Sequence, residues 1–129
     1  MQVEGFSVKD YRQPVKRYCQ FLSLKDDSEL IRLYRQAHDK EHFWREIGQG
    51  IQEVGILDMQ IFIHANHLVM IVEAPLDFDW NAAMSRLGTL PRQQEWEDHV
   101  AQFQQCAEGA TSDQKWQLME RIFHLYEEE

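Results

Sequence analysis

Tyr34 and His38 stand four residues apart in the stretch LYRQAHDKEHFWREIG (33–48), and a helix would place both side chains on one face. Histidine has an ordinary pKa of about 6.5, so near neutral pH it can both accept and donate a proton, and a tyrosine hydroxyl can hold a substrate oxygen. The pair therefore suits acid/base chemistry in one pocket. The spacing also fits a structural histidine at a helix C-terminus, where positive charge is favoured, and it leaves both interpretations open.

Metal binding is a second chemistry for the same stretch, because His38, Glu41 and His42 match the H-x-x-E-H pattern of inverted zinc proteases. Such a site needs one continuous helix and a third ligand. The pattern here falls where one predicted helix ends and the next begins. We therefore predict no metal site.

Composition limits the classes of partner. The chain has 129 residues, which suits one domain with a single core. Its 22 acidic and 13 basic residues give a formal net charge of -9. Because nucleic-acid binding needs a basic face, we expect no nucleic-acid partner. The start lacks the layout of a secretory signal and no apolar run is long enough to span a bilayer, so we expect a cytoplasmic protein without a membrane partner. Cys19 and Cys106 lack the spacing of a metal or redox motif and are expected to be reduced thiols.

The elements that would position Tyr34 and His38 follow from hydrophobic periods and from capping and turn residues. Residues 1–16 show no clear period and are predicted to form an N-terminal arm, followed by a single domain over 17–129. The pattern then predicts a strand at 17–24, a helix capped within Asp26–Ser28 that runs to His38, a helix at 43–54 ended by Gly55, a hairpin at 57–75 turning at Ala65 and Asn66, an Asp-capped helix within 77–88, a helix with Pro91 in its first turn running to 105, a loop at 108–113 and a strand at 120–126.

This order of elements predicts the fold class. It is βαββαβ with each helical leg broken in two, which is typical of the α+β ferredoxin-like fold, a four-stranded antiparallel sheet with helices on one face. The hairpin carries alternating apolar residues that are too numerous to leave both sheet faces wet, and we expect a homodimer that closes two sheets into a dimeric α+β barrel. These residues are Leu57, Met59, Ile61, Ile63, Leu68, Met70 and Val72.

Residues 17–127 resemble the L-rhamnose mutarotase family. The resemblance is carried by RYCQFLSL, by Tyr34 and His38 in YRQAH, by Trp44 and Glu46 in FWREI, and by Gly55. It continues through HLVMIVEAP, RQQEWEDHVAQF and the closing ERIFHLY. It implies a dimeric ferredoxin-like barrel that interconverts the α and β anomers of a free deoxy sugar without metal or nucleotide cofactor.

The resemblance also implies roles for single residues. His38 falls on the family's proposed proton donor, and Tyr34 falls on a sugar-binding tyrosine. Paired tryptophans of the family fall on Trp96 and Glu97, and a further sugar-binding tyrosine falls near Met59. A carboxylate in place of an aromatic ring, and a thioether in place of a phenol, change how sugar hydroxyls are recognised while leaving the proton donor in place.

The resemblance implies L-rhamnose as the substrate, and L-fucose or another 6-deoxy or pentose sugar is an alternative. Trp44 is a candidate for stacking on the sugar, and packing between helices is an equal alternative. Glu73 and Glu97 are candidates for a carboxylate that assists His38, although either one also fits a solvated rim.

Two other functions fit the same scaffold. One is a haem-degrading or quinone-forming monooxygenase, in which His38 would be an axial ligand. The other is a non-catalytic sugar-binding protein in which Tyr34 and Trp96 bind but no proton moves. Fold similarity does not choose among them, because function resides in the site.

Overall fold

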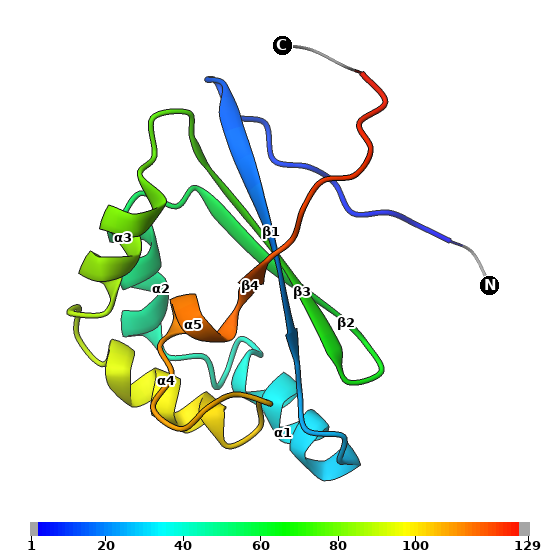
Figure 1. The fold of residues 1–129 in the computed structure, drawn as a ribbon, viewed down its shortest axis with the longest axis vertical. Helices are drawn as coiled ribbons and strands as arrows, with labels where there is room; N and C mark the ends of the chain where they lie inside the picture. Colours follow the sequence, from blue (N-terminus) through cyan, green and yellow to red (C-terminus); the bar gives the residue numbers. More distant parts are fainter. Residues whose placement is uncertain (1–2, 127–129) are drawn as a thin grey trace.

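The computed structural model describes residues 3–126 and contains one antiparallel sheet with helices against one of its faces (Figure 1). The strands β1 (Val15–Ser23), β2 (Asp58–His64), β3 (His67–Pro75) and β4 (Gln117–Leu118) pair in the order β2-β3-β1-β4. Together with the helical connections, this is the predicted ferredoxin-like arrangement. The fold class is confirmed, and the dimer stays a prediction.

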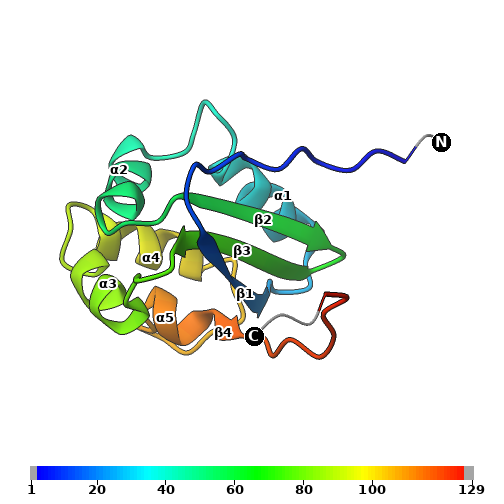
Figure 2. The same ribbon diagram turned by 90° about the horizontal axis from the view of Figure 1, so that it is seen from above.

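The two chain ends run on the side of the sheet away from the helices. Figure 1 shows this for the segments before β1 and after β4, and Figure 2 shows the N-terminal segment extending past the sheet. β1 begins at Val15, two residues before the predicted start of the strand at residue 17. Residues 1, 2 and 127–129 of the predicted arm and domain lie outside the described residues, and the predicted division at residue 16 stays a prediction.

The first helical leg is two short helices, as predicted. Asp27 caps α1 (Ser28–Ala37), because its carboxylate accepts the backbone N–H groups of Glu29 and Leu30 at 3.0 Å each. Residues 38–43 then form turns and bends before α2 (Arg45–Glu53), which is followed by Gly55 with a φ of 104°. The H-x-x-E-H pattern is thus not on one helix.

The β2–β3 turn falls at Ala65 and Asn66, as predicted, but its left-handed residue is Ala65, with a φ of 55°. Asn66, a residue type that tolerates a positive φ well, does not have one here. Asn66 instead ties the turn to the end of β1. Its side-chain amide donates to the carbonyl of Leu24 at 2.9 Å, and its own carbonyl accepts the Leu24 N–H at 2.7 Å.

The second helical leg contains α3 (Trp80–Leu87) and α4 (Gln93–Ala101). Asp79 caps α3 by accepting the N–H of Ala82 at 3.1 Å, and Gly88 follows its last residue, as predicted. The prediction of Pro91 in the first turn of α4 is wrong, because the N-cap is Arg92 in the left-handed region with a φ of 64°. The Arg92 guanidinium donates twice to Glu95, at 3.0 Å each, which holds this turn.

The C-terminal part differs most from the prediction. The predicted loop ends early, because α5 (Ser112–Lys115) contains its last two residues, and β4 is only two residues long. The predicted strand at 120–126 is wrong: these residues are irregular, and Ile122 is 92% exposed. β4 pairs with Gln20 and Phe21 of β1, one more hydrogen bond joins the Met119 N–H to the Cys19 carbonyl at 2.8 Å, and beyond it the ladder with β1 does not continue among the described residues.

Alternation along the strands divides the hairpin residues between two faces. Met59, Ile61 and Ile63 of β2 and Leu68, Met70 and Val72 of β3 belong to the core on the helical side, where Leu68 and Val72 are each 1% exposed. They are covered by helices of the same chain, so the expectation that they mark a face awaiting a second subunit is wrong. The opposite face presents Phe21, Phe62, Val69 and Ile71, by the period of two.

Candidate functional site

A cavity of about 520 Å³ lies between the helices and the sheet. Four of the residues chosen from the sequence line it: Tyr34 and His38 from α1 and its end, Met59 from β2, and Trp96 from α4. The sheet supplies an apolar floor that includes Leu68 and Met70. The fold therefore brings together, from three separate elements, four of the candidate residues chosen from the sequence.

His38 is held in one orientation. It is the residue that follows α1, and its Nδ1 lies 2.8 Å from the backbone carbonyl oxygen of Tyr34. A carbonyl only accepts, so Nδ1 carries the proton and Nε2 is the nitrogen left to react. The ring packs against Tyr34, Trp96 and Phe43, with centroid distances of 4.4, 5.3 and 6.0 Å.

The surroundings of His38 favour the neutral imidazole. Burial lowers its pKa below the ordinary value, the hydrogen bond to the Tyr34 carbonyl partly opposes this, and nearby His99 lowers the pKa further. Near neutral pH, Nε2 is therefore an unprotonated base that can take a proton and return it.

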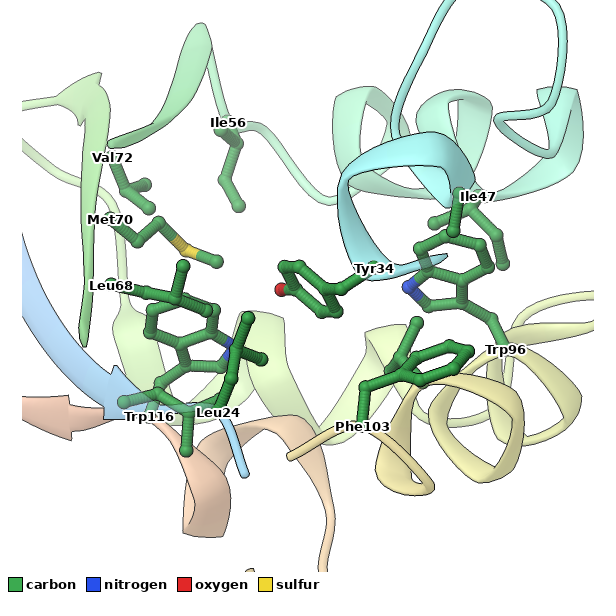
Figure 3. Packing of buried hydrophobic residues seen from close by; sticks show 13 residues of the cluster. Leu24, Tyr34, Ile47, Ile56, Leu68, Met70, Val72, Trp96, Phe103 and Trp116 are labelled. Carbon is green, nitrogen blue, oxygen red and sulfur yellow. The ribbon is translucent and has the colours of Figure 1, made fainter. Parts of the chain in front are cut away.

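The Tyr34 side chain is 4% exposed, and its hydroxyl points into the space between α1 and the sheet (Figure 3). Burial raises the pKa of Tyr34, while a hydrogen bond with the Gln104 side chain lowers it by less. The phenol therefore keeps its proton across the physiological range. It can donate a hydrogen bond to an oxygen of a ligand in the cavity.

Trp96 forms part of the cavity wall, and Trp44 supports it from behind. The two rings meet edge to face with centroids 5.2 Å apart. Trp44 does not line the cavity. It is stacked on His99 at 5.3 Å, and the Arg92 guanidinium carbon lies 4.1 Å from the Trp44 ring centroid. Packing therefore accounts for Trp44, and the stacking role proposed for it would need a rearrangement.

Glu97 is buried, 4% exposed, and does not line this cavity. Its Oε2 accepts from the amide of Gln93 at 2.9 Å, and its Oε1 accepts from the backbone N–H of Ser112 at 3.0 Å. Lys115 also donates to the Glu97 backbone carbonyl at 2.7 Å. The side chain of Glu97 therefore joins α4 to α5.

Glu73 lies on the other face of the sheet. Its carboxylate accepts the hydroxyl of Tyr11 at 2.6 Å and the Nε–H of Arg17 at 2.8 Å, and it forms an ion pair with the same arginine. These hydrogen bonds, that of Tyr11 first, keep the pKa of Glu73 below its usual range despite burial. The structure therefore places this carboxylate apart from His38, with the sheet between them.

Sequence reasoning missed several polar and aromatic residues of the cavity, among them Gln20, Gln104, Lys115 and Trp116. Gln20 was predicted only as part of a strand, but the alternation in RYCQFLSL does put it on the same face as Leu22. For Trp116 no signal in the sequence was available, because its position depends on contacts between α5 and distant elements.

Comparisons with known proteins place the chain in a family. The sequence model of the L-rhamnose mutarotase family matches residues 17–125. The L-fucose mutarotase of Xanthomonas campestris pv. campestris is 34% identical over 113 residues, which cover 88% of this chain and 90% of that protein. A UPF0734 protein of Dictyostelium discoideum is 32% identical over 114 residues, which cover 85% of this chain and 90% of that protein.

Solved structures show the same fold at lower identity. The crystal structure of an L-rhamnose mutarotase from Formosa agariphila has a TM-score of 0.64 and 19% identity, and the match covers 86% of this chain and 99% of that chain. Tetracenomycin F2 cyclase from Streptomyces glaucescens, a type-II polyketide cyclase, has a TM-score of 0.52 and 17% identity, covering 88% and 99%. At these identities the likeness concerns the fold alone.

Proposed function

Because the chain belongs to the L-rhamnose mutarotase family, whose members are isomerases that interconvert sugar anomers, we propose that His38 moves the proton when a 6-deoxy-L-sugar is bound in the cavity. The chain is a sugar mutarotase of the L-rhamnose or L-fucose type. The monooxygenase and the non-catalytic binder are not favoured by the comparisons.

The reaction needs only proton transfers. A proton leaves the anomeric hydroxyl, the bond between the anomeric carbon and the ring oxygen breaks, and a proton reaches the ring oxygen, which gives the open aldehyde. Rotation about the bond next to the aldehyde and the reverse transfers close the other anomer. Nε2 of neutral His38 accepts the first proton and, as imidazolium, returns it to the ring oxygen.

The observation that carries the proposal is the fixed tautomer of His38 inside the cavity. The 2.8 Å hydrogen bond to the Tyr34 carbonyl holds the proton on Nδ1 and leaves Nε2 free, and burial lowers the pKa of His38 so that this nitrogen is unprotonated near neutral pH. A positioned acid/base group contributes roughly 10²- to 10⁴-fold. That is enough for a reaction that proceeds measurably in water.

The other candidate residues take supporting roles in this proposal. The Tyr34 hydroxyl donates to a sugar oxygen, Trp96 offers its ring to an apolar face of the sugar, and Met59 contributes apolar surface beside the sheet. Neither Glu73 nor Glu97 lines the cavity, so the proposal assigns both proton transfers to His38 without an assisting carboxylate.

Saturation transfer between the anomeric protons of a free sugar tests the proposal. L-Rhamnose and L-fucose are each measured with and without protein, and the exchange between α and β signals gives the rate directly. We expect acceleration for at least one of them, and the ratio of the two rates identifies the preferred configuration. If the protein accelerates neither sugar, the proposed substrate class is wrong.

We also propose a homodimer. The sheet face opposite the helices carries Phe21, Phe62, Val69 and Ile71, and Phe62 is covered in part by Phe6, at a centroid distance of 5.5 Å. Beside this face the segment after β4 exposes further large apolar side chains, and a monomer rarely leaves so many in water. They are Ile122, Phe123, Leu125 and Tyr126. Sedimentation equilibrium tests this, and a monomer at micromolar concentration contradicts it.

We further propose that the protein works in the cytoplasm. Cys19 and Cys106 are free thiols, which is typical of reducing compartments. Among residues 3–126 no helix is long and apolar enough to cross a membrane. Fractionation of cells that express the full chain tests the location.

A further inference from the structure

Trp116 is a second tryptophan of the cavity wall. It directly follows α5, is 6% exposed, and lines the same cavity as Tyr34 and Trp96. In Figure 3 the two indoles lie on opposite sides of Tyr34, whose hydroxyl points toward the Trp116 side. The cavity is therefore lined by indoles on two sides of Tyr34.

The two indoles differ in what covers them. Trp96 packs against four aromatic neighbours: His38, Phe43, Trp44 and His99. Trp116 has no aromatic neighbour of this kind among the described residues, and beside it in Figure 3 lie aliphatic side chains such as Leu68. The Trp116 ring lines the cavity as Trp96 does, but without aromatic rings from the described chain packed against it.

Glu97 fixes the element that carries Trp116. Its Oε1 accepts the N–H of Ser112, the first residue of α5, and its backbone carbonyl accepts from Lys115, the last. Both ends of this four-residue helix are thus tied to one residue of α4. From the sheet, the Gln20 amide donates to the Trp116 carbonyl at 3.4 Å.

A helix of one turn does not hold its own position. Isolated short helices are unstable in water, so the place of α5 depends on its tertiary bonds. Glu97 is 4% exposed, and both of its carboxylate oxygens accept hydrogen bonds. These bonds are shielded from solvent, and hydrogen bonds to a carboxylate are stronger in such surroundings than in water.

We propose that Glu97 is a positioning residue, which through Ser112 holds Trp116 as the second aromatic wall of the cavity, and that Trp116 packs on an apolar face of the bound sugar. The inference rests on the proposed function, since it assumes that the sugar occupies this cavity. It assigns a binding role to Trp116 and an indirect one to a carboxylate that does not touch the substrate.

Ser112→Pro is the sharpest test, because it removes the N–H that Glu97 accepts. Ser112 also lines the cavity, so Ser112→Ala, which keeps the N–H, controls for the lost hydroxyl. Proline is well tolerated at the first helical position, and Thr111 before it has the extended conformation that a following proline requires (φ -80°, ψ 167°). Trp116→Leu removes the ring, and Glu97→Ala removes the acceptor. Glu108→Gln, an exposed acid in the same connection, is the matched control.

The readout is the dissociation constant of L-rhamnose and L-fucose from saturation-transfer difference titrations, together with kcat and KM for anomer exchange. We expect Ser112→Pro, Glu97→Ala and Trp116→Leu each to raise the dissociation constant and KM about three- to tenfold, as loss of one aromatic contact does. The pH at which kcat falls stays that of the wild type, because His38 is untouched.

A double variant separates positioning from general damage. If Glu97 acts through Trp116, Glu97→Ala combined with Trp116→Leu weakens binding no more than either change alone. Additive losses, an unchanged dissociation constant in Ser112→Pro, or an equal loss in Glu108→Gln overturn the inference. Where Glu97→Ala does not fold, Ser112→Pro decides.

The failure of the proposed function is recognised separately. Wild-type protein that binds a sugar without accelerating exchange contradicts the role of His38 but leaves the Trp116 wall to be judged from the dissociation constants. Wild-type protein that binds neither sugar overturns both proposals.

Discussion

The two faces of the sheet bury their side chains against different kinds of neighbour. On the helical face, alternate residues of β2 and β3 line a cavity together with Tyr34, His38 and Trp96. On the opposite face, Phe62 meets Phe6 from the N-terminal segment and Glu73 binds Tyr11 and Arg17. The first face encloses a space for a ligand, and the second binds the N-terminal segment. The proposed chemistry therefore belongs to one face and the proposed assembly to the other.

The same contrast appears in two carboxylates. Glu97 and Glu73 are 4% and 3% exposed, and both have hydrogen bonds to groups from distant parts of the chain. Either one, judged by burial alone, resembles an active-site acid. Neither lines the cavity, and each joins two pieces of structure. A buried carboxylate is therefore evidence of function only when its oxygens face a space that a substrate can enter.

The largest expected effect is on the helical face. His38→Asn keeps an N–H that can donate to the Tyr34 carbonyl but cannot exchange a proton, so we expect exchange between sugar anomers to slow by roughly 10²- to 10⁴-fold. Saturation transfer measures the rate, and circular dichroism shows whether the fold is kept. A folded variant with the wild-type rate would remove His38 from the mechanism.

On the opposite face, Glu73→Gln should change stability and leave catalysis intact. The substitution weakens charge-assisted hydrogen bonds to Tyr11 and Arg17, and because Arg17 is half exposed we expect a loss of about 1–2 kcal/mol in the free energy of unfolding. Urea unfolding measures it. The control is Glu53→Gln, which breaks an ion pair with Arg86 in which both side chains are exposed, and whose expected loss is under about 1 kcal/mol.

A large fall in kcat for Glu73→Gln would contradict this division between the faces. It would restore Glu73 as the carboxylate that assists His38, either across the sheet or in a second subunit.

The parts of the fold that were predictable are those set by local chemistry. Asp27 and Asp79 cap helices through their own side chains, and the hairpin turns where two β-rich runs are separated by two residues. The pairing of Tyr34 with His38 follows from one helical turn. These interactions span few residues, and sequence alone contains them.

The parts that were not predictable depend on distant partners. β4 has two residues and is placed by Gln20 and Phe21, and α5 is placed by Glu97. The alternation in ERIFHLY suggested a strand, but the antiparallel ladder between β4 and β1 ends before this segment. Glu97 was chosen as a sugar-binding residue by its position beside Trp96, while its hydrogen bonds to Gln93 and Ser112 are visible only in three dimensions.

Tyr34→Phe should have a smaller effect than His38→Asn and should fall on binding. The phenol loses one hydrogen bond to a sugar oxygen, and a neutral bond of this kind contributes about 0.5–1.5 kcal/mol, so we expect KM to rise about two- to tenfold. The ring stays in place and continues to pack against His38. Exchange rates across a range of sugar concentrations separate KM from kcat, and a change in kcat alone would assign Tyr34 to the proton transfer.

The smallest effect is the dependence of stability on pH, which distinguishes the two faces by the range in which it occurs. The folded protein lowers the pKa of His38 below its ordinary value of about 6.5, so as pH falls below 6.5 the unfolded chain takes up this proton first and the wild type loses stability. The pKa of Glu73 is also lowered in the folded state, so its contribution to stability is lost only below about pH 4.3. Urea unfolding at pH 7.5, 6.5 and 5.5 should therefore show the wild type declining relative to His38→Asn. Since Glu73 remains ionised over this interval, Glu73→Gln should show the same decline as the wild type. A wild type that gains stability relative to His38→Asn on acidification would mean that His38 is stabilised as imidazolium, and it would then be an acid rather than the base proposed for the first proton transfer.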